Sequence, residues 1–117
     1  MKRDDDLIRE LLFKYEESED WLQLMPGQTL DSSSSARRER YHVLLLSDEG
    51  LITGVGNGTF RLTSKGHDYV SAIRSATVWN KTKEAAAQIG GATLGMMKDL
   101  AVAYLKQEAA NKLGISL

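Results

Sequence analysis

A glycine-rich turn between two stretches of helical spacing limits the possible folds of this chain more than any other feature. The stretch over residues 36–49 carries apolar side chains at helical spacing and ends at Gly50, a residue suited to the left-handed conformation that terminates helices. Residues 51–53 and 60–63 then flank the dipeptide Asn57-Gly58, a strong signal for a β-hairpin. The centre of the chain is therefore predicted to be a helix followed by a short hairpin.

The N-terminal part predicts a helix over residues 4–18. Asp4 is a good N-cap, and apolar side chains follow along one face of the helix. A weakly alternating stretch over 21–24, which stops at Pro26, predicts a short strand. The polar residues 31–35 then form a serine-rich loop that offers N-caps to the central helix.

The second half predicts two more helices, over 64–89 and 92–113, with Gly90-Gly91 as the break and Gly114 as the final stop. The expected order is α, short β, α, β-hairpin, α, α. This makes the chain mainly α with a small β-hairpin, in the α+β class. We expect a core over 1–75 and a C-terminal helical extension over 76–117, which is either part of the same compact domain or a dimerisation arm.

Composition narrows the function classes. The chain has 117 residues, a formal net charge of -1, two histidines and no cysteine, which excludes disulfides and thiol nucleophiles. No apolar stretch reaches the roughly 18 residues of a membrane span, and no signal peptide is recognisable, so we expect a cytoplasmic protein that does not enter the membrane. His42 is predicted to be a hydrogen-bonded core histidine. His67 beside Asp68 has no nucleophile at recognisable spacing, so we expect no enzyme, cofactor or metal.

The central pattern resembles the winged helix-turn-helix of bacterial regulators. It consists of Gly50-Leu51-Ile52 at a helix end, the hairpin, and Leu62-Thr63-x-x-Gly66 at the start of the next helix. In this arrangement Thr63 can cap the following helix, and Gly66 permits a close approach of backbone. The resemblance implies a winged helix-turn-helix core with the C-terminal helical extension beyond it.

A closer resemblance covers nearly the whole chain. The motifs are similar to those of a family of short bacterial and phage proteins, catalogued as a domain of unknown function, number twenty-five thirteen. The motifs are Met1-Lys2-Arg3-Asp4, Tyr41-His42, Gly50-Leu51-Ile52, Leu62-Thr63-x-x-Gly66-His67-Asp68 and Val78-Trp79-Asn80-Lys81-Thr82-Lys83. The family has no established activity, and the resemblance implies frequent residence in prophages. Glu39 stands where an apolar residue is expected, so either the central helix begins later here or its first turn is exposed.

The central helix is the one that a winged helix offers to the major groove of DNA. Arg37, Arg40 and Leu44 lie at i, i+3 and i+7 on one outward stripe, with Arg38 beside it. Arginine suits both guanine edges and phosphates. We therefore expect a small, DNA-binding transcriptional regulator of the kind carried by prophages. The residues expected to contact double-stranded DNA are Arg37, Arg38, Arg40, Leu44, Arg61 and Lys65.

Two features weaken that hypothesis. The wing tip, residues 53–60, has no charge with which to enter the minor groove, and no helix is predicted directly before the central one. The alternative is an adaptor or modulator that binds a protein partner on the same scaffold without contacting DNA. In that case Leu44 would be an exposed apolar anchor.

The last helix carries an apolar seam that steps by 3, 4 and 3 residues, like the a and d positions of a coiled coil. The seam consists of Leu94, Met97, Ala101 and Tyr104, and Leu100 widens it. We expect a homodimer through this seam. The alternative is that the helix folds back onto the first helix of the same chain.

Overall fold

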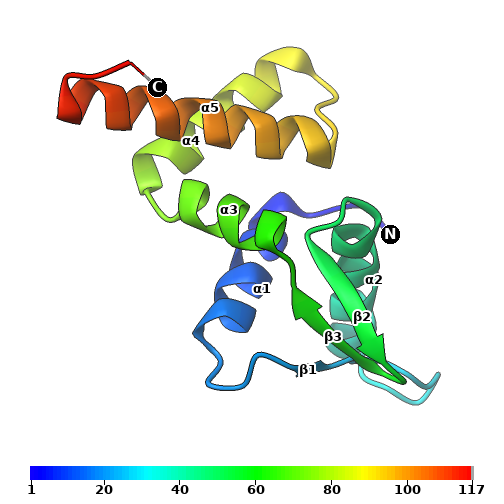
Figure 1. Ribbon diagram of the computed structural model, residues 1–117. Coiled ribbons are helices and arrows are strands. Elements are labelled where there is room, and N and C mark those ends of the chain that lie inside the picture. Colours follow the sequence, from blue (N-terminus) through cyan, green and yellow to red (C-terminus); the bar gives the residue numbers. More distant parts are fainter. Residues whose placement is uncertain (117) are drawn as a thin grey trace. The chain divides into compact units, whose positions relative to one another are not determined.

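The computed structural model describes residues 1–116 and divides the chain into two compact units, with the boundary inside a helix. Unit 1 is Met1–His67, and unit 2 begins at Asp68. Helices predominate and the strands form one small sheet, which confirms a mainly α chain with a small β-hairpin (Figure 1). The elements are α1 (Asp5–Glu17), β1 (Gln23–Leu24), α2 (Ser34–Asp48), β2 (Ile52–Gly56), β3 (Thr59–Leu62), α3 (Ser64–Ile73), α4 (Ala76–Ile89) and α5 (Leu94–Leu113).

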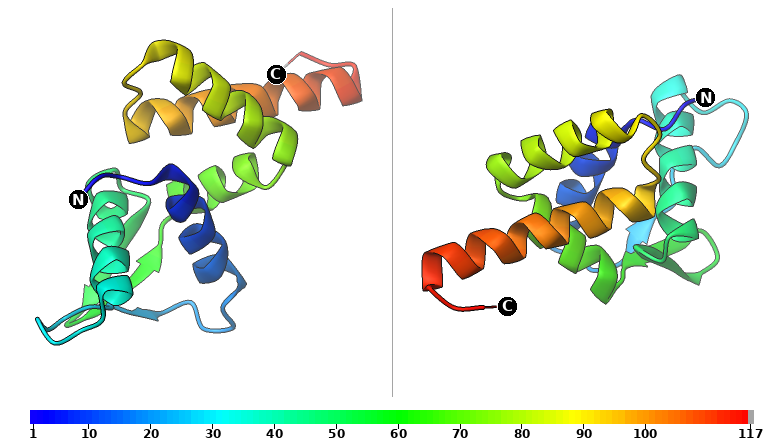
Figure 2. Two further views of the ribbon diagram at one scale, coloured as in Figure 1. Left: turned by 180° about the vertical axis from the view of Figure 1, so that it is seen from behind. Right: turned by 90° about the horizontal axis from the view of Figure 1, so that it is seen from above.

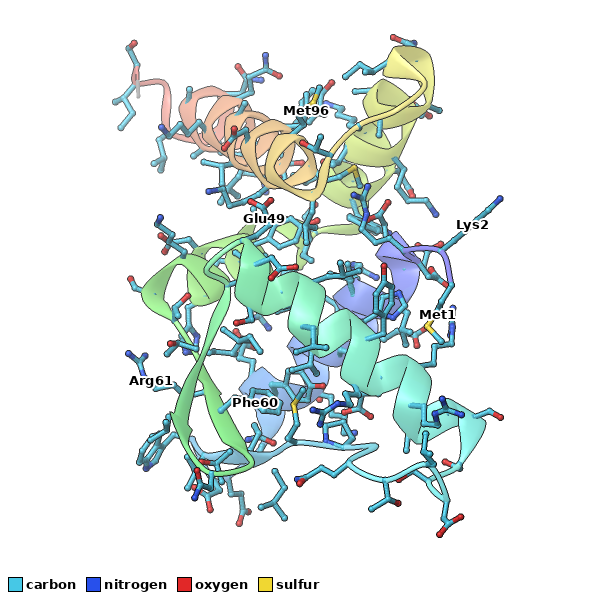
Figure 3. All side chains as sticks on the ribbon, turned by 90° about the vertical axis from the view of Figure 1, so that its right-hand side faces the viewer. Met1, Lys2, Glu49, Phe60, Arg61 and Met96 are labelled. Atoms are coloured by element: carbon cyan, nitrogen blue, oxygen red, sulfur yellow. The ribbon has the colours of Figure 1, made fainter. Side chains whose placement is uncertain are left out.

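The sheet of unit 1 is antiparallel, in the order β1-β3-β2. The predicted hairpin is confirmed, with Ile52 paired to Leu62 and a register shift between Gly54 and Gly56. β3 alternates as a half-buried strand should, so Phe60 is buried and Arg61 points outward (Figure 3). The inner face of the sheet packs with α1 and α2 around a common core. That core includes Ile8, Leu12, Val43, Leu46, Leu51, Ile52 and Phe60.

Polar caps define the ends of the elements in unit 1. Asp4 accepts a hydrogen bond from the N–H of Leu7 at 3.1 Å, as predicted for the N-cap of α1. Ser33 does the same for α2, which begins at Ser34, slightly before the predicted start. Thr63 accepts from the N–H of Gly66 at 3.1 Å and donates to the carbonyl of Gly50 at 2.5 Å, so one hydroxyl joins the end of α2 to the start of α3.

Gly66 is required by its surroundings. A Cβ built there would collide with the carbonyl oxygen of Leu51. That carbonyl also accepts the N–H of Thr63 at 3.1 Å. The first turn of α3 therefore lies directly against the strand entry, which confirms the predicted close approach.

Unit 2 holds the remainder of α3 together with α4 and α5, and α4 packs against α5 (Figure 2). The single helix predicted over 64–89 is wrong, because the chain breaks before α4. Ser75 is extended, with φ -70° and ψ 125°, and its hydroxyl accepts from the N–H of Val78 at 3.2 Å. Gly90 and Gly114 are left-handed caps at φ 79° and 68°, as predicted. No helix within residues 1–116 is long and apolar enough to cross a membrane.

Candidate binding groove

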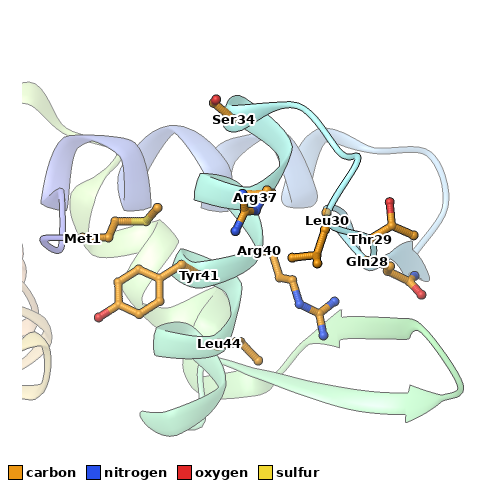
Figure 4. A pocket seen from close by; sticks show the side chains of 10 residues that line it. Met1, Gln28, Thr29, Leu30, Ser34, Arg37, Arg40, Tyr41 and Leu44 are labelled. Carbon is orange, nitrogen blue, oxygen red and sulfur yellow. The ribbon is translucent and has the colours of Figure 1, made fainter.

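The predicted stripe on α2, in which Arg37 and Leu44 are exposed and Arg40 is half-buried, forms the floor of an open groove of about 590 Å³ (Figure 4). We call this the α2 groove. Leu30 and Arg40 lie on one side of α2, and Met1 and Tyr41 lie on the other. Tyr41 is 36% exposed and faces the groove. The lining residues are Met1, Gly27, Gln28, Thr29, Leu30, Ser34, Arg37, Arg40, Tyr41 and Leu44.

The loop before α2 supplies the second wall of the groove. Gly27 has a φ of +65°, and a Cβ there would meet the carbonyl oxygen of Ala36 at 2.6 Å, so the loop lies directly on the first turn of α2. Met25 donates its N–H to the carbonyl of Gly58 at 2.8 Å. Gln28 donates from Nε2 to the carbonyl of Met25 at 2.9 Å. The loop is thereby fastened to both the helix and the hairpin.

The chemistry of the α2 groove is apolar with a positive charge. Exposed fractions are 73% for Met1, 86% for Leu30 and 45% for Leu44. Among residues 1–116, the guanidinium groups of Arg37 and Arg40 make no ion pair or hydrogen bond, and the lining contains no acid. A smaller hollow of about 280 Å³ shares Arg40 and Leu44 and continues towards the hairpin. Such a surface suits a ligand that combines apolar groups with negative charge.

Arg38 is turned away from this groove. It donates to Oδ2 of Asp4 at 2.6 Å and so joins α2 to the N-cap of α1. The hydrogen bond from the N–H of Leu7, and then the one from Arg38, hold the pKa of Asp4 below its ordinary value. Arg38 is therefore a contact between helices, and not part of the outward stripe.

His42 forms the second link between α2 and the N-terminus. The side chain is completely buried, and its Nε2 accepts the N–H of Asp4 at 2.9 Å. Nδ1 must then carry the ring proton, which it donates to the carbonyl of Arg38 at 2.9 Å. This arrangement confirms the hydrogen-bonded core histidine, and it places the residues before Asp4 beside the α2 groove.

Glu39 is explained by its contacts with α1. Its carboxylate accepts from the hydroxyl of Tyr15 at 2.7 Å and from Nζ of Lys14 at 3.2 Å. Burial, reinforced by the Glu39 carboxylate, raises the pKa of Tyr15 above its ordinary range, so the hydroxyl remains the donor. The Tyr15 ring in turn packs edge-on against Phe60, at 5.0 Å between centroids. An acid is stable at this position because its carboxylate faces α1. Glu39 lies inside α2, which begins at Ser34, so the helix does not start later than predicted.

The other two predicted contact residues lie elsewhere in unit 1. Arg61 donates to the carbonyl of Leu62 at 3.0 Å and lines a separate hollow of about 370 Å³ with Glu16, Glu19 and Trp21. Lys65 is exposed on the first turn of α3, outside the lining of the α2 groove. Of the six predicted residues, the structure therefore gathers Arg37, Arg40 and Leu44 in one place. The sequence did not predict that Met1 and the loop before α2 would line the groove. The loop reaches the groove because Gly27 lies against the first turn of α2.

The predicted dimer seam is engaged within the chain. Leu94, Met97 and Ala101 are buried, while Leu100 and Tyr104 are half-buried. Within unit 2, α5 packs against α4, whereas the sequence led us to expect either a second copy or the first helix as its partner. Leu94, Met97 and Ala101 therefore expose almost no surface with which to meet a second copy. Within the described part of the chain, no group of three or more His, Asp or Glu side chains could hold a metal ion.

Comparison with known proteins finds a matching family model and a similar protein. The family model described as "Hypothetical protein (DUF2513)" matches residues 2–93, from the N-terminus to Thr93, the N-cap of α5. A Haemophilus influenzae protein named "Uncharacterized protein" is 38% identical over 93 residues, covering 71% of this chain and 76% of that protein. No solved structure matches the chain. The family match confirms the resemblance drawn from the motifs.

Proposed function

The chain belongs to the DUF2513 family, and we propose that it is a protein-binding adaptor. Its α2 groove would take a short segment of a partner protein, without catalysis. The observation that carries this proposal is the composition of the groove. Large apolar side chains are exposed together around two arginines that have no partner among the described residues.

The exposed apolar surface favours a protein ligand. Exposed apolar patches that are rimmed by polar groups mark interaction sites. Leu30 and Leu44 would lose contact with water on binding, while Arg37 and Arg40 would orient an acidic partner through charge-assisted hydrogen bonds.

DNA binding is the second candidate function. The topology favours it, because α2 precedes the hairpin in a three-stranded sheet of order β1-β3-β2, as a recognition helix does in a winged helix. Charge argues against it. Two phosphate contacts give a salt slope of only about -2, whereas a firmly bound protein makes roughly 6–10 such contacts. The loop that walls the groove also flanks the face that would have to enter the major groove.

A random peptide library displayed on phage, selected against the immobilised full-length protein, tests the adaptor. We expect the selected peptides to contain acidic and large apolar residues. Their binding should be lost with Leu44→Asp and with Arg40→Glu. Arg61→Glu is the matched control, because Arg61 is an exposed arginine outside the groove. If no selected peptide depends on Leu44 or Arg40, the proposal is wrong.

A gel-shift assay across a salt series, with the DNA upstream of the protein's own gene, tests the second candidate. Sequence-specific binding that is abolished by Arg37→Glu with Arg40→Glu would favour the regulator over the adaptor. Absence of binding at low salt would exclude the regulator, because nonspecific contacts are strongest there.

A further inference from the structure

A second surface of unit 1 has the complementary chemistry to the α2 groove. Residues 16–24, which we call the acidic segment, join the end of α1 to β1 and contain four acids and no base. The same segment exposes Trp21 by 66% and Leu24 by 81%. Tryptophan is mostly buried in folded proteins, and its large apolar area makes it a frequent anchor of interfaces. The acidic segment therefore combines exposed apolar groups with the negative charge that the groove lacks.

The local structure fixes this segment in its exposed position. Oδ1 of Asp20 accepts the N–H of Leu22 at 3.0 Å, and Gln23 donates from Nε2 to the carbonyl of Asp20 at 2.7 Å. These bonds form a turn around Trp21. β1 then pairs with β3, with Gln23 opposite Phe60 and Leu24 opposite Thr59. Little conformational entropy would be lost when such a preformed segment binds.

We propose that the acidic segment of one copy of this protein occupies the α2 groove of a second copy. This inference rests on the proposed function, since it names the occupant of the same groove. Glu17 and Glu19 would face Arg37 and Arg40, and Trp21 would cover the apolar floor around Leu44. Opposite charges on the two surfaces set the orientation, and the apolar contact supplies most of the affinity.

A single copy cannot make this contact with itself. Trp21 lines the hollow that holds Arg61, and the lining of that hollow shares no residue with the lining of the α2 groove. The strand pairing of β1 also ties the segment to the sheet. The contact therefore joins different surfaces of two copies, head to tail, which is the kind of interface that forms rings or open chains.

Sedimentation of the full-length protein over a wide concentration range, at low salt, tests the proposal. We expect the average mass of the wild type to rise with concentration. Arg37→Glu with Arg40→Glu, and separately Glu17→Lys with Glu19→Lys, should each abolish the rise, because like charges then face each other. A chain with all four substitutions should associate again, because the charges are then complementary in the opposite sense.

A second pair of variants tests the apolar part of the contact. Trp21→Ala should weaken association on the order of thirtyfold, as expected for an interface anchor. Val55→Ala is the matched control, since Val55 is an exposed apolar residue at the hairpin tip and outside both surfaces; it should leave association unchanged. Circular dichroism of each variant checks that the chain is folded.

The outcomes separate this proposal from the adaptor. A wild type that stays monomeric at every concentration overturns self-association, and so does a four-residue variant that fails to associate. If peptides from the library still bind in the α2 groove, the adaptor stands and only the identity of its occupant is wrong. If neither peptides nor a second copy bind, both proposals fail.

Discussion

Unit 1 and unit 2 hold their helices in place by different means. In unit 1, single polar side chains bridge separate elements: Glu39 joins α2 to α1, and His42 joins α2 to the N-terminus. In unit 2, the bonds of Ser75 and Thr93 cap their own helices, α4 packs against α5, and Met97 of α5 is buried. Unit 1 therefore combines an apolar core with polar links between separate elements, and it carries the α2 groove.

The largest expected difference between the units is in the free energy of unfolding after a glycine in each unit is replaced by alanine. Gly66→Ala should lower the free energy of unfolding by about 3 kcal/mol or more, because its Cβ collides with the backbone oxygen of Leu51, which cannot move without the strand. Gly91→Ala should change it by less than about 0.5 kcal/mol, since a Cβ there meets no atom within 4 Å. Urea denaturation measures both. A tolerated Gly66→Ala would show that the junction of α2 and α3 can shift.

The next largest effect on the free energy of unfolding is expected where a substitution removes hydrogen bonds but keeps the side-chain volume. His42→Leu should cost about 2 kcal/mol, because the N–H of Asp4 loses its acceptor and the carbonyl of Arg38 loses a donor. Met97→Leu is the counterpart in unit 2, and a volume-conserving change there should cost less than about 1.5 kcal/mol. Thermal denaturation of the two variants measures and compares their losses of stability. Equal losses would contradict the contrast between the units.

Two left-handed caps allow a matched test of whether the units unfold together. Gly50→Ala in unit 1 and Gly90→Ala in unit 2 each place a Cβ in open space at φ 72° and 79°. Each should cost about 1 kcal/mol from backbone strain alone. Hydrogen exchange then shows which amides lose protection. If each change weakens only its own unit, the units unfold separately; a uniform loss would show one cooperative structure.

The smallest effect is a pH dependence from Asp4. Its folded pKa lies below the ordinary 3.8, so its contribution is complete above pH 3.8 and is lost as pH falls through the folded value. Because its side chain is 40% exposed, we expect less than about 1 kcal/mol after screening by solvent. Asp4→Asn keeps an N-cap but removes the charge opposite Arg38. Between neutral pH and pH 3, the free energy of unfolding should fall less for the Asp4→Asn variant than for the wild type. An equal decrease in the two proteins would contradict the assignment to Asp4.

The sequence predicted those elements whose signals are local. The caps at Asp4 and Thr63 and the turns at Gly50 and Gly90 follow from the preference of single residue types, and the structure confirms them. The break at Ser75 was missed because Ser75 stands within an almost continuous helical spacing. A serine inside such a pattern is compatible both with helix and with a cap, and only the capping bond to Val78 decides between them.

The candidate site was predicted only in part, for a similar reason. Helical spacing places Arg37, Arg40 and Leu44 on one face whatever the rest of the chain does. Spacing cannot show that Arg38, one residue further on, pairs with Asp4, since that ion pair joins residues far apart in the sequence. Nor can it show the loop wall, because the contact of Gly27 with α2 depends on tertiary structure.

With the exception of Met1, every residue that lines the α2 groove lies between Gly27 and Leu44. The floor and the opposing wall are thus neighbours in the chain, closed on each other where Gly27 rests on Ala36. A short stretch of gene consequently encodes all of this lining except Met1. Substitutions within that stretch can therefore change the lining of the groove without any change elsewhere in the chain.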